Sequence, residues 1–163
     1  MNFDTNAYTK ILESDYIRFI DSTPTSQTPT WVLVGAVETG NAAMEYNADI
    51  ERLKLIVNKN AITNHKSNDK QMSVPLLAYK GDPCFTFVEA GRDKLNYTTR
   101  VLEVDLWNKT GSTYAGKMSN ATIELTSYNG ETIEFNLNFD GDPVDGTVSI
   151  ADNTPTFTPT VSL

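Results

Sequence analysis

The chain has 163 residues, of which 21% are charged, and its formal net charge is −8 at pH 7. This length fits one domain with a sizeable core, with or without extensions. The negative charge argues against sequence-independent binding of DNA or RNA, because such binding requires basic side chains that neutralise phosphates.

Membrane and secretory signals are not expected from this sequence. It has no run of about 18 apolar residues that could span a bilayer. The start, MNFDTNAYTK, lacks a basic region followed by an apolar run. The single cysteine, Cys84, excludes an intramolecular disulfide framework. Together these features predict a soluble protein, made and kept in a reducing cytoplasm.

The first part of the chain, residues 1–29, is polar and irregular, and we expect it to form an N-terminal arm. Within it, Tyr16–Ile20 could be a short strand or an anchor. A Thr/Pro/Ser segment, Ser22–Pro29, follows and is typical of an extended connector. The next segment, Trp31–Val37, is a continuous apolar run of strand length, which indicates a strand buried on both faces.

A long strand is predicted over Tyr46–Val57, although Ile50, Leu53 and Val57 also fit the spacing of a helix. The polar stretch that follows, Asn58–Asp69, is predicted to be a long loop. Loops of this length inside a compact domain are usually functional or disordered. The chain then returns as a strand over Gln71–Tyr79, interrupted at Pro75.

The only predicted helix begins at Asp82-Pro83, with Asp as the N-cap and Pro at the first helical position. It would end between Ala90 and Lys94, with Phe85 and Val88 toward the core. A further strand is predicted over Thr98–Trp107, with Glu103 and Asp105 on one face and the apolar residues on the other. A flexible turn, Lys109–Lys117, follows.

The segment Ala121–Phe139 has the clearest pattern, because two strands that alternate between apolar and polar residues surround an Asn-Gly turn. Strand side chains alternate with period 2, so the loop length decides whether the two apolar sets share one face. The apolar residues are Ala121, Ile123 and Leu125 in the first strand and Ile133, Phe135, Leu137 and Phe139 in the second.

A two-residue Asn-Gly loop would pair Leu125 with Glu134 and put the apolar sets on opposite faces. A three-residue loop, Tyr128–Gly130, instead pairs Leu125 with Ile133 and gives Gly130 the left-handed position of this loop type. We therefore expect the three-residue loop. In that register Glu124 lies directly opposite Glu134, and like charges in such a position are destabilising. On a solvated surface, salt screens the repulsion between the two carboxylates, which is the simpler explanation of the pair. The alternative is that this face is acidic because its function requires negative charge.

The C-terminal part is predicted to contain a turn at Gly141–Gly146, a core strand at Thr147–Ile150 and an extended tail, residues 151–163. The whole pattern gives seven or eight strands and one short helix. It predicts an all-β fold, an antiparallel β-sandwich or barrel flanked by the helix, over residues 30–150. The helix would cover an edge or an open end.

Residues that could carry chemistry are few, and we expect no catalytic site, cofactor or metal. His65 lies in a polar segment without a second histidine or a cysteine nearby. Cys84 in the first helical turn is expected to pack as a small apolar residue. The cluster Asp140, Asp142 and Asp145 lacks the spacing of a calcium loop, so polar turn residues are the simpler interpretation.

The order of these features resembles that of the major tail tube proteins of long, non-contractile-tailed bacteriophages. The resemblance covers Trp31–Pro159 and rests on the joint order of its segments, because the family has no catalytic signature. The segments are TWVLVGAVETG, the long strand and loop to Gln71, DPCFTFVEAGRDKL, TTRVLEVDLW, the Ala115–Lys117 approach to the hairpin, and GTVSIADNTPTFTP.

The resemblance implies a virion protein, assembled in the host bacterial cytoplasm into stacked six-fold rings. The rings would surround a tape-measure protein, meet terminator and distal tail or baseplate proteins, and later conduct genomic DNA without binding it. Carboxylates lining the lumen would repel phosphates. The candidate lumen-facing acids are Glu103, Asp105, Glu124 and Glu134. The candidate inter-ring loop residues are Asn58, Lys59, Asn60, Asn64, His65, Lys66, Asn68 and Asp69.

Two other classes of protein remain open at the level of sequence. A carbohydrate-binding or adhesin sandwich would need an exposed cluster of Trp and Tyr, whereas Trp31 and Trp107 both lie in predicted strands and are expected in the core. A hydrolase would need a constellation of reactive groups, which the sequence lacks. A connector or distal tail protein of the same fold is a further alternative.

Overall fold

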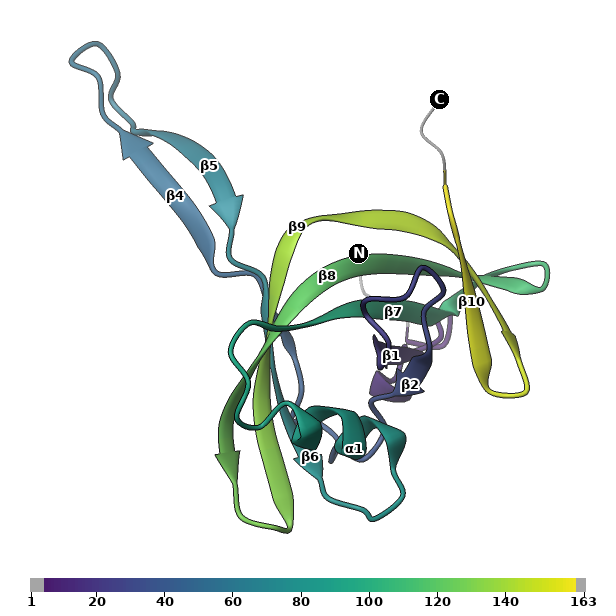
Figure 1. The fold of residues 1–163 in the computed structure, drawn as a ribbon. Coiled ribbons are helices and arrows are strands. Elements are labelled where there is room, and N and C mark those ends of the chain that lie inside the picture. The colour runs from purple at the N-terminus through teal and green to yellow at the C-terminus, as the bar shows by residue number, and fades with distance from the viewer. Residues whose placement is uncertain (1–4, 161–163) are drawn as a thin grey trace.

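The computed structural model describes residues 5–160 of the chain (Figure 1). The elements in chain order are the 3-10 turn η1 (Glu13–Asp15), β1 (Tyr16–Asp21), β2 (Trp31–Leu33), β3 (Met44–Glu45), β4 (Ala48–Leu53), β5 (Ile62–Asn68), β6 (Gln71–Leu77), α1 (Pro83–Ala90), β7 (Tyr97–Thr110), β8 (Thr113–Tyr128), β9 (Thr132–Ala151) and β10 (Thr154–Pro159). The predicted class, all-β with one short helix, is confirmed. Among the described residues no helix is long and apolar enough to cross a membrane.

Eight strands form one antiparallel sheet in the order β2-β1-β7-β8-β9-β6-β3, and β10 pairs with the C-terminal part of β9. The sheet is not closed into a barrel, because β2 and β3 at its two ends do not pair with each other. The remaining strands, β4 and β5, form a separate hairpin that projects away from the sheet (Figure 1).

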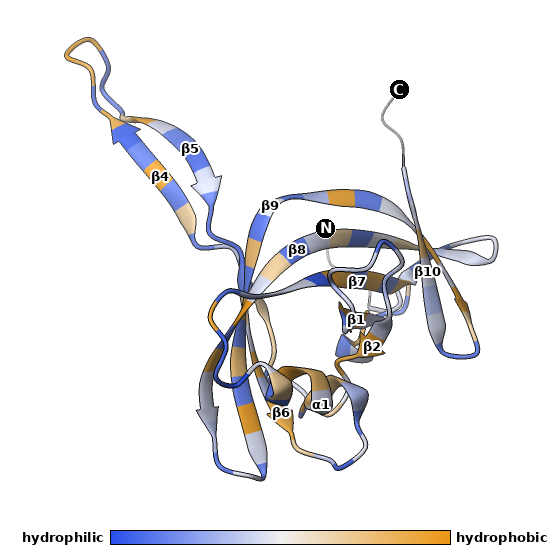
Figure 2. Cartoon of the chain, in the orientation of Figure 1, coloured by the Kyte–Doolittle hydropathy of each residue, from blue (hydrophilic) through white to orange (hydrophobic). Residues whose placement is uncertain are grey.

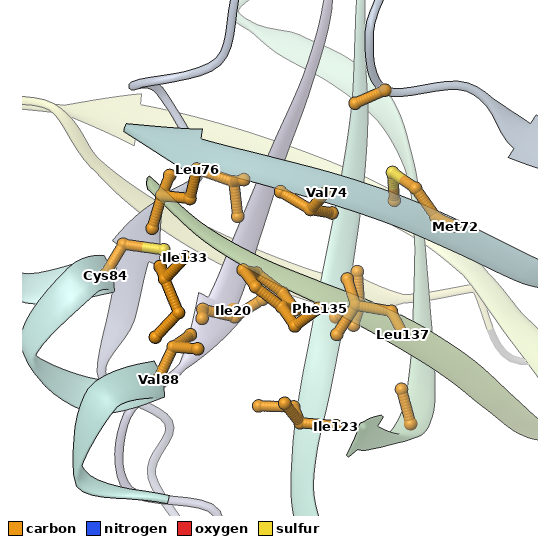
Figure 3. Packing of buried hydrophobic residues seen from close by; sticks show 14 residues of the cluster. Ile20, Met72, Val74, Leu76, Cys84, Val88, Ile123, Ile133, Phe135 and Leu137 are labelled. Carbon is orange, nitrogen blue, oxygen red and sulfur yellow. The ribbon is translucent and has the colours of Figure 1, made fainter. Parts of the chain in front are cut away.

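The main core lies between the sheet and α1 (Figure 3). Cys84 and Val88 of α1 point toward Ile133 and Phe135 of β9, and all four side chains are fully buried. The helix begins as predicted, because the Asp82 carboxylate accepts a hydrogen bond from the Cys84 N–H at 3.0 Å and Pro83 follows it. The sequence pattern thus placed the start of the helix and the burial of Val88 correctly, whereas Phe85 is only partly buried against this core.

A second, smaller core covers the opposite face of the sheet around β1 and β7. Phe19, Leu102, Val104 and Val148 form it, with Trp31 and other half-buried side chains at its edge. Because cores lie on both faces, the middle of β7 is buried on both sides. Trp107, in contrast, is about half exposed, so its expected place in the core is wrong.

The β8–β9 hairpin confirms the predicted shared apolar face but not the predicted register. Leu125 pairs with Phe135 instead of Ile133, and Tyr128 pairs with Ile133. The physical reason is twofold. The turn is longer, because Tyr128 and Ile133 are the last pair and residues 129–132 lie between them. The Asn129 side chain stabilises this turn by accepting the N–H groups of residues 131 and 132 at 3.0 and 2.9 Å. An irregularity at residues 125–127 then restores the alternation. Gly130 has the predicted left-handed conformation, with φ at 92°.

The predicted loop Asn58–Asp69 is mostly strand, because β5 occupies residues 62–68 and pairs with β4. The predicted long strand Tyr46–Val57 contains only β4 and part of a turn. Both strands of this hairpin are exposed along their whole length. A strand without a buried face has no need for alternating apolar residues, so the pattern that predicts strands is missing.

Several further boundaries differ from the expectation. Only Trp31–Leu33 of the expected strand Trp31–Val37 forms a strand, and this end strand is half-buried or exposed instead of buried on both faces. β6 runs through Pro75 without an interruption, and the expected turn Lys109–Lys117 lies mostly within β7 and β8. The turn expected at Gly141–Gly146 is instead a bulge within the continuous strand β9, with Gly141 at a φ of 70°. Part of the expected N-terminal arm is β1, an internal strand of the sheet, so the domain body begins near residue 16. Part of the expected C-terminal tail is β10; residues 1–4 and 161–163 of the two expected arms lie outside the described residues.

Candidate assembly surfaces

One face of the strands β7-β8-β9-β6 is polar and open, and we call it the polar face. The pairing of these strands places its members on the side opposite the main core. Its members are Gln71, Ser73, Thr98, Arg100, Asn120, Thr122, Glu124, Glu134, Asn136, Asn138 and Asp140.

Glu124 lies near the middle of the polar face and is exposed. Its Oε2 accepts hydrogen bonds from the side-chain amides of Asn138 at 3.2 Å and Asn136 at 3.4 Å. The predicted like-charge pair is wrong, because Glu124 lies opposite Asn136 and Glu134 lies opposite Ser127. Amide donors therefore surround Glu124 where the expected register had a second carboxylate.

The polar face carries three exposed carboxylates, those of Glu124, Glu134 and Asp140. Arg100 is the one cation among its members, and its Nε donates to the Asp21 carboxylate at 2.7 Å. Since Asp21 is fully buried, this pair holds the guanidinium at the edge of the sheet. The net charge of the polar face is therefore negative, and no member of it offers a free cation.

The other two candidate acids, Glu103 and Asp105, lie on the opposite side of the sheet. Glu103 faces Lys117 across β7 and β8, on the same side of β8 as Ile123, whereas Glu124 occupies the alternate side. The structure therefore does not bring the four candidate acids together on one surface.

Glu103 is buried within a network of charges and aromatic rings. Its carboxylate accepts hydrogen bonds from the Tyr16 hydroxyl and from Lys70 Nζ, the latter at 2.7 Å. The side chains of Glu103 and Lys70 are only 7% and 14% exposed. Burial, reinforced by the negative charge of Glu103, raises the pKa of the Tyr16 hydroxyl. The same two causes raise the pKa of the Asp105 carboxyl.

The network also anchors the projecting hairpin to the sheet. Lys70 Nζ lies 4.7 Å from the ring centre of Phe139 and 5.8 Å from that of Tyr46. Just beyond, Asn47 adopts a φ of 37°, and its side-chain amide donates to the carbonyl of Asp69 at 3.1 Å. The Asp69 N–H returns a hydrogen bond to the Asn47 carbonyl at 3.2 Å. The two ends of the hairpin are therefore tied together where it leaves the domain.

The candidate inter-ring residues all lie on this hairpin, but in different parts of it. Lys59 and Asn60 belong to its tip, and Asp69 belongs to its base. Lys66 pairs with Glu51 of β4 at 3.2 Å, and the His65 ring Nε2 lies 2.7 Å from the Asn68 side-chain oxygen. Asn64 lies opposite Glu51 in β5, and the half-buried Asn58 closes the turn through its N–H to the Leu55 carbonyl at 3.1 Å.

The residues missed by the sequence reasoning are the apolar ones at the hairpin tip. Figure 2 shows a hydrophobic loop at the far end of a hydrophilic hairpin. Leu55, Ile56 and Val57 are exposed there, and Ile56 has no shielding at all. The run Leu-Ile-Val is a visible signal in the sequence, but the predicted long strand Tyr46–Val57 includes it. Its position at an exposed tip marks it as a surface for a partner.

The side chains that the sequence offered for chemistry lie in separate places in the structure. No group of three or more His, Cys, Asp or Glu side chains in residues 5–160 is arranged to hold a metal ion. Of the Asp cluster, Asp140 accepts from Thr122 at 3.0 Å and Asp145 pairs with Lys117 at 2.6 Å. Cys84 is buried as expected, and burial raises the pKa of its thiol.

No family model matches the chain, and no curated protein matches it. A solved structure does match: the SPP1 tail tube, determined by solid-state NMR and cryo-EM, with a TM-score of 0.61. The chain shares the fold of a tail tube protein. The match covers 88% of this chain and 82% of the other, at 16% sequence identity. At this identity the likeness concerns the fold, and it agrees with the family resemblance carried by the order of the sequence segments.

Proposed function

We propose that this chain is a structural subunit that assembles with copies of itself into the tail tube of a long, non-contractile phage tail. The observation that carries the proposal is the shared fold with the SPP1 tail tube over most of both chains. Surfaces that have no partner among residues 5–160 of the same copy support it. They are the polar face, the exposed hairpin tip and the outer edges of the sheet.

The sheet edges favour assembly side by side. β6 pairs with β9 along its whole length. On its outer side β3 covers only the first two residues, and the Leu77 N–H at its end donates to the Ala36 carbonyl at 2.8 Å, which leaves Ser73–Leu76 between these two contacts. Pro75 lies on β6, as is common for edge strands. At the other end of the polar face, β1 pairs with residues 101–105 of β7 and leaves Tyr97–Arg100 outside the ladder. Copies joined at these edges would continue the polar face around a six-fold ring.

The polar face would then line the channel. Its carboxylates, Glu124, Glu134 and Asp140, repel phosphates, and its amides and hydroxyls are neutral. Since retention of nucleic acid needs cations that replace condensed counterions, DNA would pass this surface without sticking. Glu103 contributes little here, because Lys70 neutralises it inside the domain. The proposed mechanism is physical and involves no reaction. Copies of the subunit form a ring, the rings stack through the hairpin, and the channel surface does not bind DNA.

The proposed partners follow from the same assignment. Stacked rings would enclose a tape-measure protein and end at terminator and distal tail or baseplate proteins, in a virion assembled in the host cytoplasm. Head-to-tail contacts between stacked rings leave an open, polymerising interface. The hairpin, which carries the candidate inter-ring residues, would make that contact.

Negative-stain electron microscopy over a concentration series, with tail-tip components added, tests the proposal. The wild-type chain is expected to form hollow tubes or six-fold rings. A variant with Ile56→Ser and Val57→Ser should lose them, because the tip no longer buries apolar surface. Leu95→Ser is the matched control, since Leu95 is equally exposed but lies between α1 and β7. Monomers under all conditions would overturn the proposal.

A further inference from the structure

The apolar tip of the hairpin has no partner among the described residues of its own chain. Leu53, Leu55, Ile56, Val57 and Ile62 are all more than two-fifths exposed. The hairpin strands pair with each other and with no strand of the large sheet. An exposed apolar cluster at the end of a long projection costs solubility, so a partner that buries it is expected.

A groove on the body of the domain has matching character, and we call it the η1–β2 groove. It measures about 480 Å³ and lies between η1, β1 and the segment from β2 to Thr39. Leu12, Ile17, Leu33 and Val37 line it, and Leu12 and Leu33 are half exposed. The groove lies beside β2, an end strand of the sheet that pairs only with β1.

The charges of the two surfaces are complementary. Around the tip, the segment 52–60 (RLKLIVNKN) contains Arg52, Lys54 and Lys59 and no acid, within a chain whose net charge is −8. Glu13 is the acid that lines the groove, and two further acids, Asp15 and Glu38, lie next to lining residues in the chain. The one cation lining the groove, Arg18, is buried and donates to the Ala42 carbonyl at 3.0 Å. Opposite potentials of this kind set which surfaces meet and in what orientation.

We propose that the hairpin tip of one copy occupies the η1–β2 groove of a second copy. The contact would bury Ile56 and Val57 against Leu12 and Leu33, while Lys54 and Lys59 meet Glu13 and Glu38. Because tip and groove are different surfaces, the contact is head-to-tail and repeats from copy to copy. The inference rests on the proposed self-assembly and adds to it the surface that receives the hairpin.

Cross-linking between two single-cysteine additions tests the contact directly. The natural Cys84 is buried, so a short bis-maleimide should leave the wild-type chain as single chains. A mixture of Ile56→Cys and Leu33→Cys copies is expected to give a band at the mass of two chains. The matched control mixes Ile56→Cys with Leu95→Cys, at a position that is exposed but does not line the groove. This mixture should give only the background seen with each variant alone.

A charge exchange provides an independent arm of the test. Lys54→Glu should reduce the cross-linked fraction roughly tenfold or more, because like charges then face each other across the contact. Glu38→Lys in the receiving copy should restore it. Equal cross-linking of Ile56→Cys to the groove and to position 95, or no rescue by Glu38→Lys, would overturn the proposal.

Electron microscopy of the same samples separates the two levels of the account. Rings or tubes without the cross-link between positions 56 and 33 would overturn the groove contact and leave the proposed assembly intact. Absence of both assembly and cross-link would overturn both. A cross-link that appears only after removal of residues 1–11 would assign the groove to the chain's own N-terminal segment, and would also overturn the contact between copies.

Discussion

The buried ion pair between Lys70 and Glu103 provides the sharpest test of the energetics. At 2.7 Å the Coulomb attraction amounts to about 6 kcal/mol with an effective dielectric constant near 20, before the cost of desolvation is subtracted. Lys70→Met removes the cation and leaves a carboxylate that is only 7% exposed. Removal of one partner from a buried pair costs about 3–5 kcal/mol, so we expect a loss of that size in the free energy of unfolding.

The assay is urea unfolding of Lys70→Met, Glu103→Gln and the double variant, at neutral pH. The double variant should be more stable than Lys70→Met, because the neutral amide that Glu103→Gln introduces needs no cation and can still accept a hydrogen bond from Tyr16. Hydrogen exchange at the Asp69 N–H, which bonds to Asn47 at the hairpin base, should quicken in Lys70→Met if Lys70 anchors the hairpin. A loss below about 1 kcal/mol would refute the reasoning, because surface pairs alone have such small values.

Three further predictions concern the cap, a close approach between strands and the pH dependence. Asp82→Ala removes the side chain that caps α1 and should cost about 1 kcal/mol in urea unfolding, whereas Asp82→Asn should cost little. Gly146→Ala would place a Cβ 2.4 Å from the Thr158 carbonyl oxygen, so we expect β10 to pack less tightly against β9. Hydrogen exchange should be faster at the Thr160 N–H, which bonds to the Asp145 carbonyl. Unchanged exchange at Thr160 would contradict this prediction. The raised pKa of Tyr16 means that folding favours its neutral form, so its contribution is complete below the ordinary pKa of 10.0 and is lost as pH rises above it. Tyr16→Phe should therefore flatten the alkaline decline of the unfolding free energy, and an unchanged slope would argue against this origin.

The sequence predicted best where a segment has one buried and one exposed face. The apolar alternation of the β8–β9 hairpin and the Asp82-Pro83 start of α1 were both confirmed. The register failed by two residues because the Asn129 turn and the irregularity near Thr126 depend on local hydrogen bonds that alternation does not encode. The alternation of apolar and polar residues predicts which face of the sheet a side chain occupies. The geometry of the turn determines which residue of the neighbouring strand lies opposite it.

Prediction was poorer where structure depends on partners distant in the sequence. β5 has no buried side chain and exists through its pairing with β4, so its polar sequence favoured a loop. The burial of Glu103 depends on Lys70 and Tyr16, which lie 33 and 87 residues away. Of the four acids that the sequence predicts for one acidic face, Glu124 and Glu134 lie on the polar face, whereas Glu103 and Asp105 lie on the other side of the sheet. The third carboxylate of the polar face, Asp140, belongs to a segment for which the sequence predicts a turn.

A cryo-EM reconstruction of assembled tubes tests the central claim most directly, because it shows which face of the sheet lines the channel. The account predicts six copies per ring, with the polar face of β7-β8-β9-β6 inward and Glu124, Glu134 and Asp140 at the channel wall. The reconstruction would contradict the account if these three carboxylates lay on the outer surface of the tube or within a contact between copies.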